Sequence, residues 1–243
     1  MRETSGTETV KVVALVLAGG TGSRMGRPKQ FIDLLGEPAL SYTLRAFEEA
    51  AGVDGIYVVG DAARVGPLAE EAGISRYAGC AAPGENRPGS AIEGLGMVDE
   101  PEDTLVLVHD GSRCLVTRDL IERVVAAASD PIPDGVIPAL PVPDTVKEVR
   151  EGVVRETLDR SRLQAVQTPQ SFRLGPLREA YRESGEALER VTDDASLIEM
   201  RGGVVRVVEG ERTNIKLTSP EDLIFARAIL QARLAEAGRG VAG

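Results

Sequence analysis

The chain has 243 residues, of which 42% are hydrophobic and 27% charged, and its 38 acidic and 28 basic side chains give a net charge of −10. This acidic balance, with 3% aromatic residues and no Trp, argues against a nucleic-acid partner, which requires basic and stacking surfaces. No apolar run reaches the roughly 18 residues of a membrane-spanning helix, and the polar start holds no signal-peptide core, so we expect no membrane partner.

Hydrophobic patterns predict strands and helices in alternation. Segments that are nearly all apolar are typical of buried strands, and apolar residues recurring every three or four positions are typical of amphipathic helices. Thr117 is expected to cap one helix, and Ser219 to open the last one ahead of Pro220. The buried face of that last helix is expected to carry Leu223, Ala226, Leu230 and Leu234. We expect strands at 10–17, 55–60, 104–109, 135–140, 203–208 and 215–217, and helices at 38–51, 62–72, 90–98, 117–129 and from 219 onward.

This alternation indicates an α/β fold with a mainly parallel sheet that helices cover on both faces. We therefore expect a three-layer, Rossmann-like, nucleotide-binding sheet in a single domain that spans residues 10–236. Ligands of such sheets bind at the carboxyl ends of the strands, so the loops that follow 10–17 and 104–109 are the first places to look for chemistry.

One segment breaks the alternation. Two β-like runs, 145–149 and 153–158, are joined by Arg150-Glu151-Gly152, which is typical of a hairpin. An isolated two-stranded ribbon is marginally stable and must pack on something. We interpret residues 141–165 as a protruding β-arm that docks on a second subunit; the alternative is a hairpin folded against its own domain.

The strand at 10–17 runs directly into the glycine-rich sequence Leu17-Ala18-Gly19-Gly20. Three cations, Arg24, Arg27 and Lys29, follow within a few residues. Backbone N–H groups and cations delivered to one point are suited to hold polyphosphate. The loop lacks the glycine spacing of a dinucleotide fingerprint and of a P-loop. It is interpreted as a phosphate loop of a third kind, with an ordinary connecting turn as the alternative.

A second candidate site follows the strand at 104–109. Asp110 there could hold Mg²⁺ through one carboxylate together with substrate phosphates, or could simply cap a helix. Arg113 could grip a phosphate through two hydrogen bonds, or form a surface ion pair. His109 is the only histidine, and its place in the strand pattern favours a structural role over general-base chemistry.

Further candidates lie later in the chain. The loop 83–90, with Ser90 at its end, could approach a base or ribose. Lys216 and Arg160 offer cations at a predicted strand end and just past the hairpin, while the acids of Thr192-Asp193-Asp194 are common at a helix start for electrostatic reasons alone. The two cysteines, Cys80 and Cys114, form no metal or disulfide pattern and fit a reducing, cytoplasmic location.

Taken together these motifs resemble the 2-C-methyl-D-erythritol 4-phosphate cytidylyltransferase family, from about Val12 to Leu230. Each motif alone is weak, but their order is specific. The resemblance rests on Ala18-Gly19-Gly20, Arg24-Met25, Pro28-Lys29-Gln30, Gly84, Arg87, Ser90, Val108-His109-Asp110, Arg113, Asp144-Thr145, Thr157-Leu158-Asp159-Arg160, Thr168-Pro169-Gln170, Thr192-Asp193-Asp194-Ala195-Ser196 and Asn214-Ile215-Lys216.

The resemblance implies an α/β nucleotide-binding domain whose β-arm embraces a partner in a homodimer. It implies a cytidylyltransferase that joins CTP and 2-C-methyl-D-erythritol 4-phosphate to give 4-diphosphocytidyl-2-C-methyl-D-erythritol and pyrophosphate, in the non-mevalonate isoprenoid pathway, with Mg²⁺ or another divalent cation. The implied catalytic residues are Arg24, Lys29, Arg160 and Lys216. The implied nucleotide-binding residues are Leu17, Ala18, Gly19, Gly20, Gly84, Glu85, Ser90 and Asp110. The implied substrate-binding residues are Asp110, Arg113, Thr145, Arg160, Thr168 and Lys216, and Asp110 is the implied metal ligand.

Two stretches depart from the usual pattern of the family: the Leu17-Ala18-Gly19-Gly20 opening, and Gly111 and Cys114 around Arg113. The same opening occurs in cytidylyltransferases for other polyol phosphates such as ribitol 5-phosphate, which is the first alternative. The element 157–160 favours the methylerythritol enzyme. A dinucleotide-dependent dehydrogenase and a nucleotide-binding regulator without turnover are the alternatives of other classes.

Overall fold

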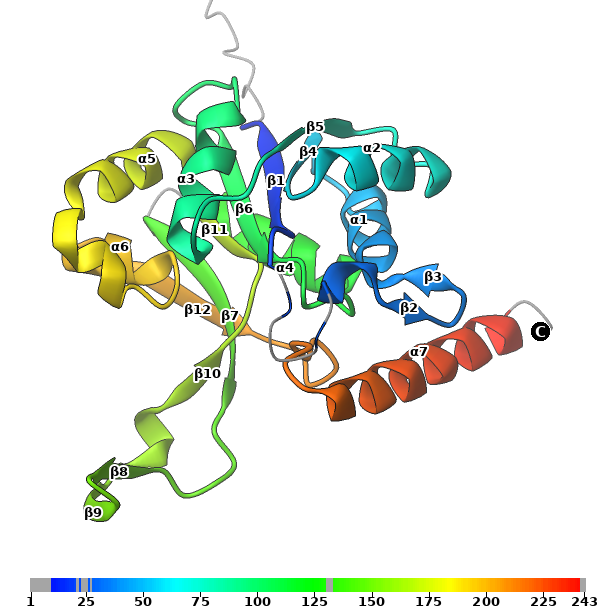
Figure 1. Ribbon diagram of the computed structural model, residues 1–243. Coiled ribbons are helices and arrows are strands. Elements are labelled where there is room, and N and C mark those ends of the chain that lie inside the picture. Colours follow the sequence, from blue (N-terminus) through cyan, green and yellow to red (C-terminus); the bar gives the residue numbers. More distant parts are fainter. Residues whose placement is uncertain (1–9, 21, 23–25, 27, 130–132, 241–243) are drawn as a thin grey trace, which may run out of the picture.

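The computed structural model describes residues 10–20, 22, 26, 28–129 and 133–240. Its described residues form an eight-stranded central sheet in the order β10-β7-β11-β6-β1-β4-β5, with β12 paired to β7 (Figure 1). The strands are β1 (Val12–Leu17), β4 (Gly55–Val59), β5 (Tyr77–Ala81), β6 (Leu105–Asp110), β7 (Gly135–Pro141), β10 (Gln164–Val166), β11 (Gln170–Arg173) and β12 (Val205–Glu209).

The sheet is mostly parallel, as predicted. β1 pairs in parallel with β4 and β6, β4 with β5, and β7 with β12. β11 is reversed and lies antiparallel between β6 and β7, and β10 is antiparallel to β7. The hydrophobic pattern had not predicted β5, β10 or β11.

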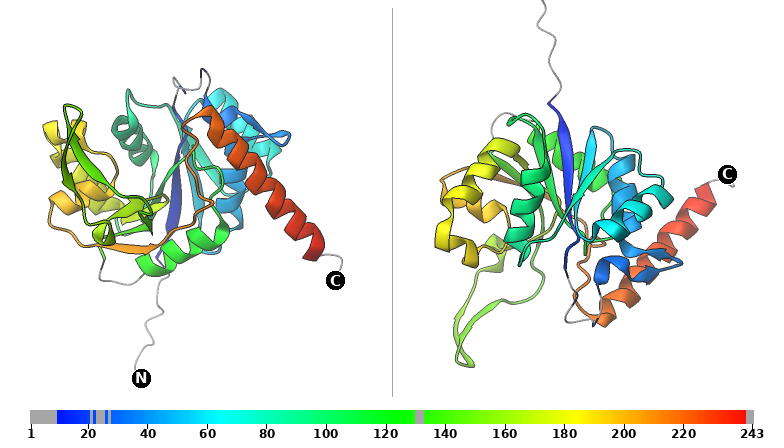
Figure 2. Two further views of the ribbon diagram at one scale, coloured as in Figure 1. Left: turned by 90° about the horizontal axis from the view of Figure 1, so that it is seen from below. Right: turned by 45° about the horizontal axis from the view of Figure 1, so that its top comes forward.

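Helices cover both faces of the sheet and make the predicted three layers (Figure 2). The side chains of β1 alternate: Val12, Ala14 and Val16 face α1, α2 and α4, whereas Val13 and Leu15 face α3, α5 and α6. The helices are α1 (Ala39–Glu49), α2 (Ala62–Glu71), α3 (Arg87–Met97), α4 (Arg118–Ala128), α5 (Leu174–Glu183), α6 (Ala195–Met200) and α7 (Pro220–Gly240), with short 3₁₀ turns at η2 (Lys29–Phe31), η3 (Arg160–Arg162) and η4 (Gly185–Arg190).

Two helix starts follow from caps. Thr117 caps α4 as predicted, because its hydroxyl accepts a hydrogen bond from Leu120 N at 3.1 Å. α3 begins three residues before the predicted Ser90, because the Asn86 side chain accepts a hydrogen bond from Gly89 N at 2.8 Å and so closes an earlier first turn.

The C-terminal helix α7 packs on its own small core. Leu223, Ala226 and Leu230 are buried with Leu217, as predicted. The prediction for Leu234 was wrong: its side chain is 62% exposed, because the helix has by then extended past the body of the protein (Figure 1). The predicted strand at 215–217 was also wrong, since this segment crosses the edge of the sheet and Leu217 N donates a single hydrogen bond to Ser112 O.

The predicted hairpin is present as β8 (Lys147–Arg150) and β9 (Val153–Thr157), a separate two-stranded sheet that projects from the body (Figure 1). Glu151 and Gly152 form its turn, with φ of 52° and 75°. A second small hairpin, β2 (Asp33–Leu34) with β3 (Glu37–Pro38), lies beside α7. None of the described helices combines the length and the apolar character needed to cross a bilayer.

Gly94 gives a test of how closely α3 packs on the sheet. A Cβ atom at Gly94 would lie 2.6 Å from both Leu15 Cδ1 and Val59 Cγ2. We expect Gly94→Val to lower the free energy of unfolding by about 1–3 kcal/mol, measured by urea denaturation, because overpacking pushes the helix off the sheet.

Gly96→Ala is the matched control on the same helix, since a Cβ there would meet nothing within 4 Å. It should leave the free energy of unfolding unchanged or raise it by about 0.5–1 kcal/mol. A Gly94→Val protein as stable as the original would contradict the close contact.

Candidate functional site

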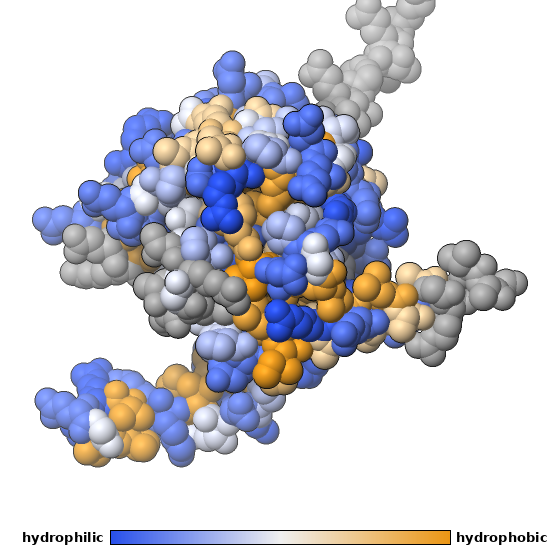
Figure 3. Space-filling view, turned by 45° about the vertical axis from the view of Figure 1, so that its right-hand side comes forward, coloured by the Kyte–Doolittle hydropathy of each residue, from blue (hydrophilic) through white to orange (hydrophobic). Residues whose placement is uncertain are grey.

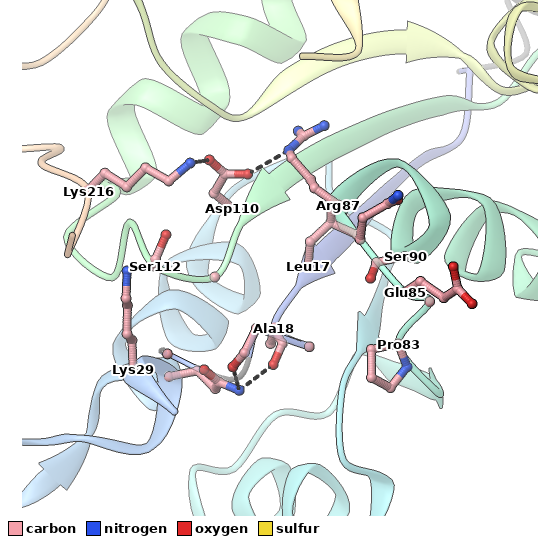
Figure 4. A pocket seen from close by; sticks show the side chains of 17 residues that line it. Leu17, Ala18, Lys29, Pro83, Glu85, Arg87, Ser90, Asp110, Ser112 and Lys216 are labelled. Carbon is pink, nitrogen blue, oxygen red and sulfur yellow. Dashed lines mark hydrogen bonds and ion pairs between the residues drawn. The ribbon is translucent and has the colours of Figure 1, made fainter. Parts of the chain in front are cut away.

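A cavity of about 490 Å³ opens at the carboxyl ends of β1 and β6, between the glycine loop after β1 and the start of α3 (Figure 4). Ten of the predicted site residues line it: Leu17, Ala18, Gly19, Gly20, Lys29, Gly84, Glu85, Ser90, Asp110 and Lys216. Pro83, Asn86, Arg87, Gly111, Ser112 and Gln30 also line it and had no predicted role.

The glycine loop is held from behind by Gln30. Its Nε2 donates to Ala18 O at 2.5 Å and to Gly20 O at 3.2 Å, so one buried side chain fixes two carbonyls of the loop. A Cβ atom on Gly19 would lie 2.2 Å from Pro83 Cβ, so only glycine lets the two loops come this close.

The second loop is equally tight. A Cβ atom on Gly84 would lie 2.4 Å from the carbonyl carbon of Gly89, at the first turn of α3. Ser90 is buried in that turn and lines the cavity. The two loops therefore present backbone to the cavity with few side chains in the way, as a ligand read by backbone groups requires.

Asp110 ends β6 and lies between two cations (Figure 4). Arg87 Nε donates to its Oδ1 at 3.1 Å, and Lys216 Nζ donates to its Oδ2 at 2.7 Å. Burial by itself raises the pKa of this carboxyl, but the charges of Arg87 and Lys216 outweigh it and hold the pKa well below its usual range. Asp110 is therefore an anion throughout the physiological pH range.

Lys29 and Lys216 face the same cavity although 187 positions separate them in the sequence. Lys29 Nζ donates to Leu217 O at 2.9 Å, which places it against the segment that carries Lys216. Two cations on one cavity are what a polyphosphate site needs. Arg24, predicted as a third, lies outside the described residues, as does Arg27.

Arg87 had no predicted role beyond its place in the family motif. Besides Asp110 it contacts Asp194, to whose Oδ2 its Nη2 donates at 2.6 Å. Burial by itself lowers the pKa of the guanidinium, but Asp194 and Asp110 raise it above its usual range. No local pattern in the sequence pointed to this role, because the partner Asp194 lies 107 positions away.

His109 and Thr168 support Asp110 from behind and do not line the cavity formed by the described residues. Thr168 Oγ1 accepts a hydrogen bond from Asp110 N at 3.1 Å and lies 3.1 Å from His109 Nδ1, and His109 Nε2 lies 3.2 Å from Arg113 O. The imidazole also packs edge-on against Phe47. This is the structural role predicted for His109.

Arg113 is half-buried and holds two loops together. Its Nη1 donates to Asn214 O at 2.8 Å and its Nη2 to Val166 O at 3.3 Å, and burial lowers its pKa. It is not among the residues described around the cavity. In this arrangement its hydrogen bonds go to backbone carbonyls rather than to an ion-pair partner.

Thr145 and Arg160 lie on the projecting arm, away from the cavity. Arg160 Nη1 donates to Pro143 O within the arm, and both side chains are exposed. Within one chain, the predicted site residues of the arm therefore lie apart from those that line the cavity.

The described residues hold no group of three or more His, Cys, Asp or Glu side chains that could bind a metal. A carboxylate at a cavity that two lysines line nevertheless fits Mg²⁺, which is usually bound by one or two carboxylates and completed by substrate phosphates and water. Asp110, ionised and at the cavity, has the required chemistry.

Comparisons with known proteins agree with one another. The family model of 2-C-methyl-D-erythritol 4-phosphate cytidylyltransferase matches residues 12–232. The enzyme of that name from Rubrobacter xylanophilus is 60% identical over 91% of this chain and 95% of its own length. The crystal structure of 4-diphosphocytidyl-2C-methyl-D-erythritol synthase from Anaerococcus prevotii has a TM-score of 0.80 at 30% identity, covering 92% of this chain and 97% of that chain. The enzyme from Thermus thermophilus has a TM-score of 0.73 at 32% identity, covering 89% and 98%.

The buried His109 predicts a pH dependence of stability. Its side chain is 0% exposed, and burial lowers its pKa from 6.5 to about 4. Between these values the unfolded chain binds a proton that the folded protein does not, so the free energy of unfolding falls as the pH falls, by up to about 1.4 kcal/mol per pH unit.

The measurement is urea denaturation in metal-free buffer, from about pH 7 to about pH 4.5, of the original protein and of His109→Asn. The gap in stability between the two should narrow as the pH is lowered, because only the original protein loses the contribution of a neutral imidazole. Parallel curves would show that His109 titrates alike in both states.

Proposed function

We propose a division of roles among the site residues of this chain, which belongs to the 2-C-methyl-D-erythritol 4-phosphate cytidylyltransferase family. The enzyme transfers the cytidylyl group of CTP to 2-C-methyl-D-erythritol 4-phosphate and releases pyrophosphate, a step of isoprenoid biosynthesis. The observation that supports the division of roles is the meeting of Lys29, Lys216 and Asp110 on one cavity walled by two glycine loops. The two unpaired thiols of the protein, Cys80 and Cys114, support a cytoplasmic location.

CTP lies along the two glycine loops. The backbone from Leu17 to Gly20 faces the phosphates, and Gly84, Glu85 and Ser90 hold the cytidine. The close approach of Gly19 to Pro83 supports this role, because it leaves room for a ligand against bare backbone. Gln30 keeps the first loop in the orientation that its ligand needs, through the carbonyls of Ala18 and Gly20.

The chemistry requires charge neutralisation rather than proton abstraction. A phosphate monoester is mostly dianionic at pH 7, since its second pKa is near about 6. It attacks the α-phosphorus of CTP, the bond from that phosphorus to the bridging oxygen breaks, and pyrophosphate leaves with the electron pair. Lys29 stabilises the charge that builds on the α-phosphate, and Lys216 serves the second substrate. Arg24 is proposed to share this catalytic role with Lys29. Arg113 and Thr168, which are not among the described residues that line the cavity, support the second-substrate site through Asn214 O and Asp110 N.

Mg²⁺ is proposed as the cofactor, with Asp110 as the protein ligand. When bound it neutralises phosphate charge and aligns the leaving group. Asp110 supports this role by being ionised and by ending β6 at the cavity. His109 takes no part, since it is buried behind Asp110 and its pKa is about 4.

The arm is proposed to complete the site of a second copy in a homodimer. The space-filling view shows apolar surface on the arm and along α7 (Figure 3). Val149, Val153 and Val154 are 53%, 54% and 55% exposed, although they occupy a hairpin too small to be stable alone. Thr145 and Arg160 would then reach the partner's second substrate, which accounts for their distance from the cavity of their own chain.

Turnover tests these roles directly. With CTP, Mg²⁺ and 2-C-methyl-D-erythritol 4-phosphate, pyrophosphate release should be lowered by about 100-fold or more in Lys29→Ala, because a cation facing the developing charge is lost. Lys11→Ala is the control: Lys11 pairs with Glu100 at 2.7 Å on the surface, and its loss should leave turnover within about twofold. Near-normal turnover of Lys29→Ala would remove it from the catalytic set.

A mixture of two defective chains tests the arm. Arg160→Ala and Lys29→Ala chains, co-expressed, form a heterodimer in which one body is intact and receives an intact arm. A random mixture should recover about a quarter of the original activity, because half of the dimers are mixed and each has one good site. If Arg160 serves its own chain, the mixture stays as inactive as its components.

A further inference from the structure

A chain of buried polar contacts runs from Asp110 away from the cavity. Arg87 donates to Asp110 Oδ1 through Nε and to Asp194 Oδ2 through Nη2. The other oxygen of Asp194 accepts a hydrogen bond from the Tyr181 hydroxyl. These polar contacts thereby connect four parts of the fold: the end of β6, the first turn of α3, α5 and the start of α6.

The two groups farthest from the cavity are remote from solvent. Asp194 is 0% exposed and Tyr181 is 6% exposed, and neither is among the described residues that line the cavity. Burial is the largest cause that raises the pKa of Tyr181 above its usual range, and the neighbouring charge of Asp194 adds to it, so the hydroxyl keeps its proton and acts as a donor.

Such an arrangement is a costly way to gain stability. A buried ion pair rarely contributes more than well-packed apolar side chains of the same volume would. Its distinctive property is geometry, because a guanidinium that bridges two carboxylates fixes the orientation of both. Here one of those carboxylates is Asp110.

The two oxygens of Asp110 differ in their partners. Oδ1 is held by Arg87, which is itself anchored at Asp194. Oδ2 is held by Lys216, whose side chain is 41% exposed and lies on a loop without regular secondary structure. Oδ1, the inner oxygen, therefore has a partner that is fixed at its other end. Oδ2, the outer oxygen, has a partner that can move away.

We propose that Asp194 and Tyr181 are positioning residues, which lock Arg87 against Asp110 and so direct the outer oxygen of Asp110 into the cavity. The inference rests on the proposed role of Asp110 toward Mg²⁺ and CTP. Neither positioning residue touches substrate, and each acts through Arg87.

Three variants test the proposal in the full-length enzyme, with kcat and KM measured for CTP in the presence of Mg²⁺, well below the melting temperature of each protein. Asp194→Asn should lower kcat/KM for CTP by about 10–100-fold, the usual loss when a residue that orients a metal ligand is removed. Tyr181→Phe removes a single hydroxyl and should lower kcat/KM for CTP by about 10-fold. Arg87→Lys keeps the charge but cannot bridge two carboxylates, so it should resemble Asp194→Asn rather than the original enzyme.

A double-mutant cycle separates positioning from packing. Asp110→Asn is combined with Asp194→Asn and with Tyr181→Phe. If both residues act through Asp110, adding either change to Asp110→Asn should lower kcat/KM by less than about twofold further. Tyr42→Phe is the control, since the Tyr42 hydroxyl also donates to one acceptor, Leu34 O at 2.6 Å, and its loss should leave kcat/KM unchanged.

Three outcomes would overturn the inference. The first is a Tyr181→Phe protein that melts at a lower temperature but retains kcat/KM, which is the behaviour of a purely structural contact. The second is a full additional loss in the Asp110→Asn background. The third is near-normal turnover of Asp110→Asn alone, which would refute the proposed role of Asp110 itself. This outcome can be told apart from failure of the positioning role, because the variant leaves Asp194 and Tyr181 unchanged. Tyr181→Phe keeps the test open if Asp194→Asn fails to fold.

Discussion

The site depends on the carboxylate of Asp110, whose charged form would be unfavourable at this buried position without two neighbouring cations. Asp110 is almost completely buried at the end of β6, and removing water from a charge costs far more than any single hydrogen bond returns. Arg87 and Lys216 offset that cost from two other parts of the chain. The ionised carboxylate is therefore stable at this position only when all three segments are in place.

The walls of the cavity follow a second constraint, which is close packing against two glycines. Gly19 lies against Pro83, and Gly84 lies against Gly89, at distances that leave no room for a Cβ atom. Gln30 ties the first loop to the turn that carries Lys29. These contacts fix how closely the two loops approach each other, so substitution of either glycine would push the walls of the cavity apart.

Sequence patterns predicted the parts of this protein whose signals are local. The apolar runs of β1, β4 and β6 and the glycine loop could be located because each is continuous in the chain. β5, with Ala and Gly among its five residues, and the short β11 carry no such signal. The bond from Arg87 to Asp194 spans 107 positions and could not be seen, and Leu234 was misplaced because helical periodicity does not reveal where the core ends.

The reversed strand β11 determines what can stand behind the cavity. In an all-parallel sheet, every loop at the carboxyl edge leaves a strand, and the loops that enter strands lie at the opposite edge. Because β11 runs the other way between β6 and β7, the residues that lead into it arrive at the same edge as Asp110. Thr168 can therefore brace Asp110 through its hydroxyl, and Gln170 can reach Asp193 at the start of α6. Because one strand is reversed, loops that enter a strand and loops that leave a strand meet at this edge. The entering loop supplies side chains behind the cavity that an all-parallel sheet could not place there.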